Sequence, residues 1–413
     1  MIRIEGGRPL RGTVRAAGAK NAALPAVMAS LLTPEPVVLE NVPHLLDVDA
    51  AVDLAEALGK RATWEDSTLV LSGGEELAAE APAGIVGRMR ASFLALGPLL
   101  ARRGEAAMPL PGGCAIGPRP VDLHLAGLRR LGASFDMRGG TVYARASRLR
   151  AATVYLDYPS VGATEQLLLT GALAEGTTAV VNPAREPEVV DLGVLLTRMG
   201  APVVWHEDRV TIQGRRELTG ARHRVIPDRV EAGTYLLAGA VTRGEVTVTG
   251  ARADHLDALL AKLSEAGAEI GVEDSAITVR LARRPQAVSL QTLPYPGFPT
   301  DLQPPMIAFL ATADGRSTVR ETVFASRFNC VEALVRMGAR LQVSGDTLLL
   351  DGVEALHGAP VEATDIRAGA ALVLAGLAAE EVTEVHGEEH LARGYEGLPE
   401  KLRALGAEVW VAD

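Results

Sequence analysis

The sequence contains little cysteine and no long apolar run. Only Cys114 and Cys330 occur among its 413 residues. They lie too far apart to predict a disulfide framework or a pair of metal ligands, which favours a reducing compartment. No uncharged apolar run reaches the ~18 residues that a membrane-spanning helix needs. We therefore expect a soluble, cytoplasmic protein.

Several signatures of cofactor and metal chemistry are also missing. The chain has no GxxxxGK(S/T) motif, no HExxH, no CxxC, and no GxGxxG after a predicted strand. These absences argue against P-loop, dinucleotide and zinc chemistry. The eight histidines do not cluster, and His124 is expected on a helix surface. We expect no metal ion and no cofactor.

Lysine is scarce in this chain. Only four of the 41 basic residues are lysine, and the others are arginine. The formal net charge of −10 argues against a nucleic-acid binder held by phosphate contacts. Because arginine is the usual basic residue here, a single arginine carries little information. A lysine at an unusual position carries more.

Six similar segments divide the chain into repeats. Segments such as LAEALGK, GLRRLGA and LRALGA each end an amphipathic helix, with a glycine at the C′ position every 67 to 73 residues. A polar hairpin is predicted after each of the first five helices, but only one strand follows the sixth. The N-terminal segment IRIEGG could supply the missing strand. The six glycines are Gly59, Gly132, Gly200, Gly267, Gly338 and Gly406.

A second helix in each repeat is apolar on nearly every side. NAALPAVMASLL, AGTYLLAGAVT and AGAALVLAGLAA have no polar face, so these helices must be buried all round. Each repeat is predicted to run strand, buried helix, strand, amphipathic helix, hairpin. We expect an α/β fold with helices inside and sheets outside, three repeats to a domain. A repeat scaffold without chemistry is the alternative.

Polar residues at the starts of the buried helices argue against a scaffold. A helix N-terminus binds anions readily, so we expect a phosphate or carboxylate site where the two domains meet. Capping is the alternative explanation, and it accounts for Ser160, Thr164 and also Asp228. It does not account for Lys20, whose charge opposes the helix dipole. The residues are Lys20, Asn21, Arg90, Ser160, Thr164, Asp228, Arg229, Asp301, Asp365 and Arg367.

Cys114 lies in PLPGGCAIGPRPVDL, a loop of glycine and proline that cannot form a core. A thiol near Arg119 and free backbone N–H groups should have a pKa below the ordinary ~8.5, and could act as nucleophile or acid. An accidental surface cysteine is the alternative. Equivalent loops carry Arg185, Arg327 and Arg393, whereas Cys330 starts an amphipathic helix and is expected to be structural.

At these residues the sequence closely resembles the UDP-N-acetylglucosamine 1-carboxyvinyltransferases, the enolpyruvyl transferases that begin peptidoglycan synthesis. The resemblance implies two inside-out α/β barrel (prism) domains, each of three repeated units, which agrees with the repeat pattern. We assign residues 20–226, with the Cys114 loop, to one domain and residues 1–19 plus 227–413 to the other. The matching motifs include AGAKNAALP, MRASFLALGPL, PGGCAIGPRPVDLH, SVGAT, AREPEVVD, PDRVEAGT, FPTDLQ, ETVFASRF, ATDIRAGAALVLAG and RGYEGL.

The resemblance implies transfer of the enolpyruvyl group of phosphoenolpyruvate to the 3-hydroxyl of UDP-N-acetylglucosamine, with release of phosphate, through a tetrahedral phospho-ketal. This is the first committed step of peptidoglycan biosynthesis. We expect a monomer whose partners are these two small molecules, without a nucleic-acid, membrane or metal partner.

The resemblance also implies roles for single residues. Cys114 donates a proton and can form a thioether with C2 of phosphoenolpyruvate, and Asp301 is the base near the sugar hydroxyl. Lys20, Arg119 and Arg393 hold phosphate, so Lys20 and Arg393 join the catalytic set. Arg327 and Arg367 face the phosphoenolpyruvate carboxylate or the closed interface. The other expected substrate contacts are Asn21, Arg90, Pro120, Val121, Asp122, Leu123, Ser160, Val161 and Val323.

Two departures and two alternatives remain. Tyr158–Pro159 stands where the family has Lys–Val, which puts one nucleotide contact in doubt, and RFNCV differs after Arg327. A 3-phosphoshikimate 1-carboxyvinyltransferase would carry Ser-Lys-Ser near its N-terminus and lack the loop cysteine, so GAKNAALP and Cys114 argue against it. A non-catalytic UDP-sugar-binding paralogue is less favoured because Lys20, Cys114, Arg119, Asp301 and Arg393 are all present.

Overall fold

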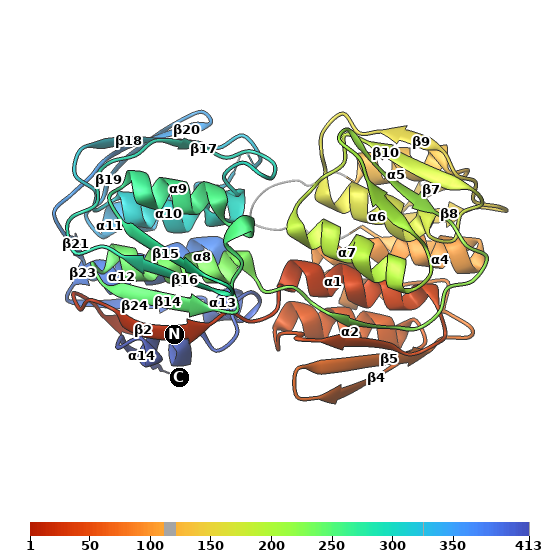
Figure 1. The fold of residues 1–413 in the computed structure, drawn as a ribbon, viewed down its shortest axis with the longest axis horizontal. Coiled ribbons are helices and arrows are strands. Elements are labelled where there is room, and N and C mark those ends of the chain that lie inside the picture. The colour runs from red at the N-terminus through yellow and green to blue at the C-terminus, as the bar shows by residue number, and fades with distance from the viewer. Residues whose placement is uncertain (111–120, 325, 413) are drawn as a thin grey trace. The chain divides into compact units, whose positions relative to one another are not determined.

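The structure is a computed structural model that describes residues 1–110, 121–324 and 326–412. The chain forms two compact units (Figure 1). The C-terminal unit comprises Met1–Ala17 and Pro227–Asp413, and the N-terminal unit lies within residues 18–226. The chain therefore passes from one unit to the other after Ala17 and again after Ile226.

Each unit consists of three repeats of one pattern. In a repeat, a leading strand and a second strand pair in parallel, and a buried helix precedes the second strand. An outer helix and an antiparallel hairpin follow, and these strands form one sheet; in the sixth repeat β21 (Leu356–His357) and β23 (Ala379–Glu380) form a separate two-stranded sheet. In the second repeat the leading strand is reduced to a single bridge between Glu80 and Ala107.

The N-terminal unit contains the first three repeats, with sheet orders β13-β3-β5-β4, β6-β8-β7 and β11-β12-β10-β9. The first has α1 (Lys20–Ala29), η1 (Ser30–Leu32), β3 (Val37–Glu40), α2 (Leu46–Ala57), β4 (Lys60–Glu65) and β5 (Thr68–Gly73). The second has α3 (Ala83–Val86), η2 (Arg90–Ala95), α4 (Leu96–Arg103), β6 (Glu105–Pro109), α5 (Asp122–Arg130), β7 (Ser134–Arg138) and β8 (Thr141–Arg145). The third has β9 (Thr153–Tyr155), α6 (Val161–Gly171), β10 (Thr177–Val181), α7 (Pro187–Arg198), β11 (Val203–Trp205), β12 (Arg209–Gln213) and then β13 (Ala221–Arg224).

The C-terminal unit contains the other three, with sheet orders β15-β16-β14-β2, β17-β18-β20-β19 and β22-β24-β1-β25. The fourth has β2 (Arg11–Arg15), α8 (Arg229–Val241), β14 (Glu245–Thr249), η3 (Ala253–His255), α9 (Asp257–Glu265), β15 (Glu269–Glu273) and β16 (Ala276–Arg280). The fifth has β17 (Leu290–Gln291), η4 (Thr300–Leu302), α10 (Gln303–Leu310), β18 (Arg316–Arg320), α11 (Val331–Arg336), β19 (Arg340–Ser344) and β20 (Thr347–Asp351). The sixth has β1 (Ile2–Glu5), β21 (Leu356–His357), β22 (Pro360–Glu362), α12 (Ile366–Ala378), β23 (Ala379–Glu380), β24 (Val382–His386), α13 (Glu388–Ala392), α14 (Leu398–Ala404) and β25 (Glu408–Val411).

The first repeat of each unit takes its leading strand from a distant part of the chain. β13 pairs in parallel with β3, and β2 pairs in parallel with β14. The end of the β2 segment is held by two hydrogen bonds: Ala17 N–H donates to Glu231 Oε2 (2.6 Å), and Asp228 N–H donates to Ala17 O (2.9 Å). The two passages of the chain between the units are thus needed to complete the first sheet of each.

The N-terminal strand completes the sixth repeat. β1 lies between β24 and β25 and is antiparallel to both, with Ile4 opposite Thr383 on one side and Val409 on the other. The prediction that IRIEGG supplies the missing strand is therefore confirmed.

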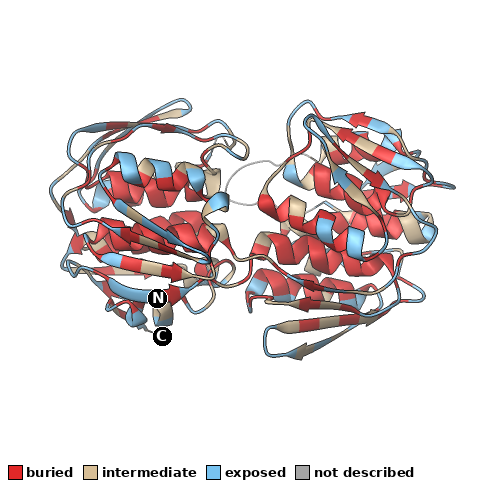
Figure 2. Cartoon of the chain, viewed as in Figure 1, coloured by how far each residue is buried: buried red, intermediate tan, exposed pale blue. Residues whose placement is uncertain are grey.

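The helices that are apolar on nearly every side form the centre of each unit. All residues of α10 are buried, and so are all of α8 except Arg229. In the C-terminal unit α8, α10 and α12 pack against one another, and Figure 2 shows the buried central helices in red beside sheets that alternate between buried and exposed residues. The predicted fold class, helices inside and sheets outside, is confirmed.

The outer helices end as predicted. All six C′ glycines have a positive φ, from 92° at Gly338 and Gly406 to 115° at Gly59. Residues with a Cβ rarely adopt this conformation, so glycine ends the helix and turns the chain into the hairpin.

The buried helix of the second repeat differs from the prediction. It begins as the 3₁₀ helix η2 and becomes α-helical only at Leu96. Pro98 explains the change, because proline has no N–H to donate to the carbonyl of Leu94 in a continuous α-helix.

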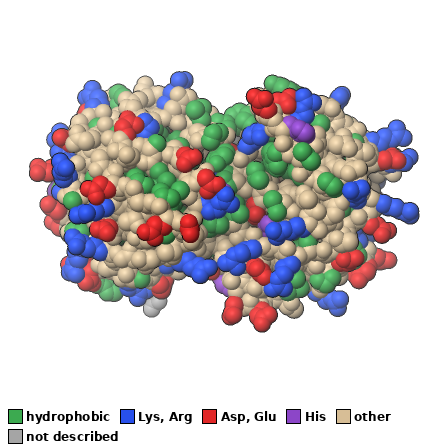
Figure 3. Space-filling view, viewed as in Figure 1, with side chains coloured by type: hydrophobic (Ala, Val, Ile, Leu, Met, Phe, Trp, Pro, Cys, Tyr) green, Lys and Arg blue, Asp and Glu red, His purple; other side chains and the backbone are tan. Residues whose placement is uncertain are grey.

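The described surface carries both signs of charge. On the face drawn in Figure 3, acidic and basic side chains are interspersed. Among the described residues, none of the helices has the length and apolar character needed to cross a membrane.

Replacing Ile4 with alanine should destabilise the C-terminal unit by about 2–4 kcal/mol, because a large-to-small change at a fully buried site leaves a cavity. Amide hydrogen exchange should show reduced protection in β24 and β25. Arg3→Ala, an exposed position of the same strand, is the matched control and should leave protection unchanged. Wild-type protection in Ile4→Ala would contradict this role for β1.

Candidate active site

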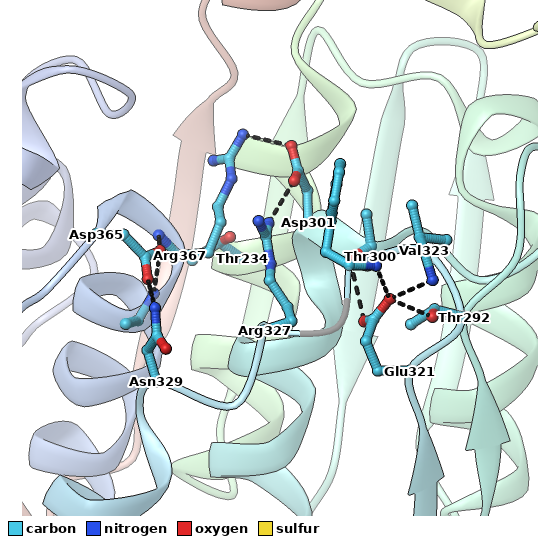
Figure 4. A network of polar contacts seen from close by, with 12 residues as sticks. Thr234, Thr292, Thr300, Asp301, Glu321, Val323, Arg327, Asn329, Asp365 and Arg367 are labelled. Carbon is cyan, nitrogen blue, oxygen red and sulfur yellow. Dashed lines mark hydrogen bonds and ion pairs between the residues drawn. The ribbon is translucent and has the colours of Figure 1, made fainter. Parts of the chain in front are cut away.

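The side chain of Asp301 lies between two arginines of the C-terminal unit (Figure 4). Arg327 Nη2 donates to Asp301 Oδ1, and Arg367 Nη2 donates to Asp301 Oδ2 across 2.9 Å. The arginines are 2% and 5% exposed, whereas the Asp301 side chain is 26% exposed. Three predicted site residues are thus in direct contact, and the carboxylate is the most accessible of them.

Local capping places Arg367 in this cluster. Asp365 is the N-cap of α12, and its Oδ1 accepts hydrogen bonds from the backbone N–H of Arg367 (2.9 Å) and of Ala368 (3.1 Å). Its Oδ2 accepts from Asn329 Nδ2 (3.2 Å). Asp365 therefore fixes the first turn of α12 and ties it to the segment that follows Arg327.

A buried tyrosine orients Arg367, and the sequence analysis missed it. Arg367 Nη1 donates to the hydroxyl of Tyr395 (3.3 Å), and its guanidinium lies 5.6 Å from the centre of that ring. Thr234 Oγ1 lies 3.1 Å from the Tyr395 hydroxyl and already donates its own proton to Val230 O (2.8 Å). Tyr395 must therefore donate to Thr234 and accept from Arg367, which leaves Nη2 of Arg367 directed at Asp301.

The charge of Arg367 is secured by its neighbours. Burial by itself lowers the pKa of Arg367, but Asp301, Tyr395 and Asp228 together raise it above its ordinary value. Arg367 stays cationic, and Asp301 faces a permanent positive charge.

Lys20 is the first residue of α1 in the N-terminal unit and is buried. Its Nζ lies 3.0 Å from Oδ2 of Asp47, a buried residue in the first turn of α2. The N-cap Ala19 makes no side-chain capping bond, so Lys20 places its charge at an uncapped helix start. Asp47 was missed because nothing in the sequence connects it with Lys20.

Several predicted sugar-nucleotide contacts gather around His124 in the N-terminal unit. A Cβ at Gly162 would come within 2.7 Å of His124 Nε2, so the start of α6, where Ser160 and Val161 lie, packs closely on α5. The ring of Phe93 lies 5.8 Å from that of His124, edge to face, which brings η2 and its first residue Arg90 to the same place. Val121, Asp122 and Leu123 lie at the start of α5.

The prediction for His124 itself was wrong. It is 5% exposed instead of lying on a helix surface. Burial, with Arg90 nearby, lowers the pKa of His124 to about 4. The imidazole is therefore neutral at physiological pH, and it is a packing residue of this cluster.

Capping explains other predicted positions. Ser160 Oγ accepts from Ala163 N–H (3.3 Å), and Asp228 Oδ1 accepts from Val230 N–H (2.8 Å) and Glu231 N–H (3.0 Å). Thr164 does not cap; its hydroxyl donates to Ser160 O and accepts from Ala184 N–H.

The loop arginines differ in their surroundings. Arg185 donates to His206 O and Glu207 O and stacks on Trp205, so it holds a hairpin. Arg393 is the half-buried C-cap of α13. Asn21 is half-buried in α1 and Val323 half-buried after β18. Cys114, Arg119 and Pro120 lie outside the described residues.

No metal centre is formed by the described residues, among which no group of three His, Cys, Asp or Glu side chains is arranged to hold an ion. Cys330 is buried, as expected for a structural cysteine. Burial, with the Asp365 carboxylate nearby, raises the pKa of Cys330 to about 12.

Comparison with known proteins defines the class of this chain, which is that of the enolpyruvyl transferases. The family model described as EPSP synthase (3-phosphoshikimate 1-carboxyvinyltransferase) matches residues 4–402. The solved structure of the enolpyruvyl transferase NikO from Streptomyces tendae has a TM-score of 0.90 and 30% identity over 99% of this chain and 98% of its own. EPSP synthase from Acinetobacter baumannii, at 20% identity and a TM-score of 0.78 over 99% of each chain, shows the fold alone.

Within this class the chain belongs to the UDP-N-acetylglucosamine 1-carboxyvinyltransferase family. The relative from Carboxydothermus hydrogenoformans named UDP-N-acetylglucosamine 1-carboxyvinyltransferase 2 is 51% identical over 98% of each chain. The one from Symbiobacterium thermophilum named UDP-N-acetylglucosamine 1-carboxyvinyltransferase 3 is 49% identical over 99% of this chain and 97% of its own. The predicted family is confirmed.

Cys330 should be unreactive in the folded protein, because a thiol with so high a pKa forms almost no thiolate at pH 8. In a Cys114→Ala variant, iodoacetamide should therefore label no thiol before unfolding and Cys330 after unfolding in urea, as counted by mass spectrometry. Labelling of the native variant would show that Cys330 is accessible and ionised.

Proposed function

We propose that this chain transfers the enolpyruvyl group of phosphoenolpyruvate to the 3-hydroxyl of UDP-N-acetylglucosamine and releases phosphate. The observation that carries the proposal is the Asp301 carboxylate between Arg327 and Arg367, in a chain about half identical to proteins named for this reaction. The reaction needs a base for the hydroxyl, an acid for C3 of phosphoenolpyruvate, and cations for the phosphate.

Asp301 is suited to be the base. Each of its oxygens accepts a hydrogen bond from an arginine, and a carboxylate offers about four acceptor positions in all. The two guanidiniums favour the ionised form. A sugar hydroxyl beside Asp301 can therefore donate its proton to an oriented carboxylate.

Lys20 is suited to hold phosphate. Its ammonium stands at the uncapped N-terminus of α1, where the helix dipole also favours an anion. Asp47 fixes the position of the ammonium by accepting one hydrogen bond from it. Arg119 and Arg393 complete the proposed phosphate contacts, since arginine can bind phosphate with two parallel hydrogen bonds.

Cys114 is the proposed acid, and its loop lies outside the described residues. Protonation of C3 and attack of the hydroxyl on C2 give the tetrahedral ketal, from which phosphate then leaves. Cys114 can instead add to C2 and form a thioether.

The residues around His124 are the proposed contacts of the nucleotide sugar. They lie at the starts of η2, α5 and α6, and helix starts favour anions such as the diphosphate. Tyr158, which stands where the family has lysine, is 40% exposed near this cluster, so the nucleotide contact of that lysine is missing or replaced here.

The alternatives have less support. Solved EPSP synthases are only 18–20% identical to this chain, whereas the curated UDP-N-acetylglucosamine 1-carboxyvinyltransferases are 44–51% identical. A non-catalytic UDP-sugar binder would not need Asp301 held by two buried arginines. Monomeric state and cytoplasmic location stay predictions.

Phosphate release from phosphoenolpyruvate tests the proposal. Wild-type protein should release phosphate with UDP-N-acetylglucosamine as acceptor and not with shikimate 3-phosphate. Cys114→Ala should lose this activity, and Asp301→Asn should lower kcat by about 100-fold or more, since general base catalysis contributes about 10²–10⁴-fold.

Cys330→Ala is the matched control and should keep wild-type activity, because the Cys330 thiol is buried. Phosphate release with shikimate 3-phosphate would favour a 3-phosphoshikimate 1-carboxyvinyltransferase. If the wild-type protein binds UDP-N-acetylglucosamine but releases no phosphate, this would favour a non-catalytic UDP-sugar-binding paralogue.

A further inference from the structure

Glu321 is a buried carboxylate to which the reaction as proposed assigns no part. It follows β18 directly and is 2% exposed. Carboxylates are rarely buried this fully unless hydrogen bonds satisfy both oxygens. Among the described residues, its partners are hydroxyl and backbone N–H groups and not a basic side chain (Figure 4).

Four donors surround this carboxylate. Oε1 accepts from the Thr292 hydroxyl (2.8 Å), from Val323 N–H (2.8 Å) and from Phe324 N–H (3.0 Å). Oε2 accepts from the Thr300 hydroxyl (3.0 Å). All four groups donate, so both oxygens of the carboxylate are satisfied by hydrogen bonds within the protein.

The donors belong to three segments of the chain. Thr292 follows β17, and its hydroxyl also accepts a hydrogen bond from the backbone N–H of Thr322 (3.0 Å). Thr300 lies in η4 and precedes Asp301. Val323 and Phe324 form the turn that leads to Arg327. One carboxylate therefore joins the segment of the proposed base to the segment of the arginine that binds it.

We propose that Glu321 is a positioning residue for enolpyruvyl transfer, which fixes Asp301 and the Val323 turn in the geometry that the acceptor sugar requires. This rests on the proposed function, in which Asp301 and Val323 contact the sugar. Glu321 touches neither substrate. It acts through Thr300 and through the two backbone N–H groups.

The geometry separates this role from general stabilisation of the fold. Thr292 and Thr300 each donate one hydroxyl to Glu321, but only Thr300 adjoins Asp301. Thr300→Val removes the branch toward the base, and Thr292→Val removes a branch on the same carboxylate that leads to Thr322 and not to Asp301. A purely structural Glu321 would make the two variants equivalent in their kinetics.

Glu321→Gln is the conservative variant. Its amide oxygen can replace Oε1 and keep three donors, while its amide nitrogen faces the Thr300 hydroxyl, which can turn to accept. The turn at Val323 is kept and only the hold on Thr300 is altered. Glu321→Ala removes all four bonds and is the severe variant, whose folding must be checked first.

Steady-state kinetics should show a specific pattern. In Thr300→Val and Glu321→Ala, kcat should fall about 10- to 100-fold, because a small misplacement of a reacting group costs rates of that order. KM for UDP-N-acetylglucosamine should rise while KM for phosphoenolpyruvate stays near its wild-type value. Glu321→Gln should retain most of the activity, and Thr292→Val should differ from wild type in thermal stability only.

The pH profile gives a second readout. Glu321 does not exchange a proton with substrate, so the profile of kcat in Glu321→Gln should keep both limbs at the wild-type pH values. A missing limb would overturn the positioning role. So would wild-type kcat and KM in both Thr300→Val and Glu321→Ala, or an equal loss of kcat in Thr292→Val and Thr300→Val.

Hydrogen exchange separates failure of this proposal from failure of the proposed function. If wild-type protein does not use UDP-N-acetylglucosamine, the proposed function is wrong, but the link through Glu321 can still be measured. Amides of residues 300–303 should exchange faster in Thr300→Val than in wild type or Thr292→Val. Equal exchange in all three would overturn the link.

Discussion

Two guanidinium groups are buried in the C-terminal unit, and burying such charges is costly unless carboxylates and hydrogen-bond acceptors surround them. Asp301 supplies one oxygen to Arg327 and the other to Arg367. Around this triad Asp365 fixes the backbone of Arg367, Tyr395 holds the other side of its guanidinium, and Glu321 holds the residue before Asp301. Without the Asp301 charge, the buried cations Arg327 and Arg367 would lose the carboxylate that they share. The arrangement of the site and the stability of its surroundings therefore depend on the same carboxylate.

The repeat fold explains why the polar residues collect at helix starts. A helix buried on every side can meet polar groups only at its ends, and its N-terminus offers free N–H donors. At α6, α8 and α12 those donors are satisfied by Ser160, Asp228 and Asp365. At α1 the side chain of the N-cap makes no such bond, and Lys20 stands there with Asp47. Sequence reasoning assigned Ser160 and Asp228 to capping, which the structure confirms, and Thr164 as well, which is wrong. It set Lys20 apart because a cation at a helix start cannot be a cap.

Other arguments from the sequence did not identify functional or buried residues reliably. The scarcity of lysine singled out Lys20, yet Lys60 is also buried, donating to Thr33 O and Gly73 O, and Lys401 binds Glu231. A rare residue is therefore not functional merely because it is rare. His124 was expected on the surface because it lies in an amphipathic helix, but the close approach of Gly162 covers it. Asp47, Glu321 and Tyr395 had no local pattern to distinguish them, since their partners Lys20, Thr292 and Thr234 lie 27, 29 and 161 residues away.

The sequence by itself determined the repeats, the buried helices, the helix ends and the strand that closes the last sheet. These follow from periodicity, from the absence of a polar face and from glycine at positions of positive φ, all of which are properties of neighbouring residues. Only the tertiary structure decided which side chains bond to one another: the two arginines on Asp301, the Asp47 carboxylate that Lys20 binds, and the four donors to Glu321. Hydrogen bonds depend on distances of a few tenths of an ångström between segments far apart in the chain, and no local pattern of residues specifies those distances.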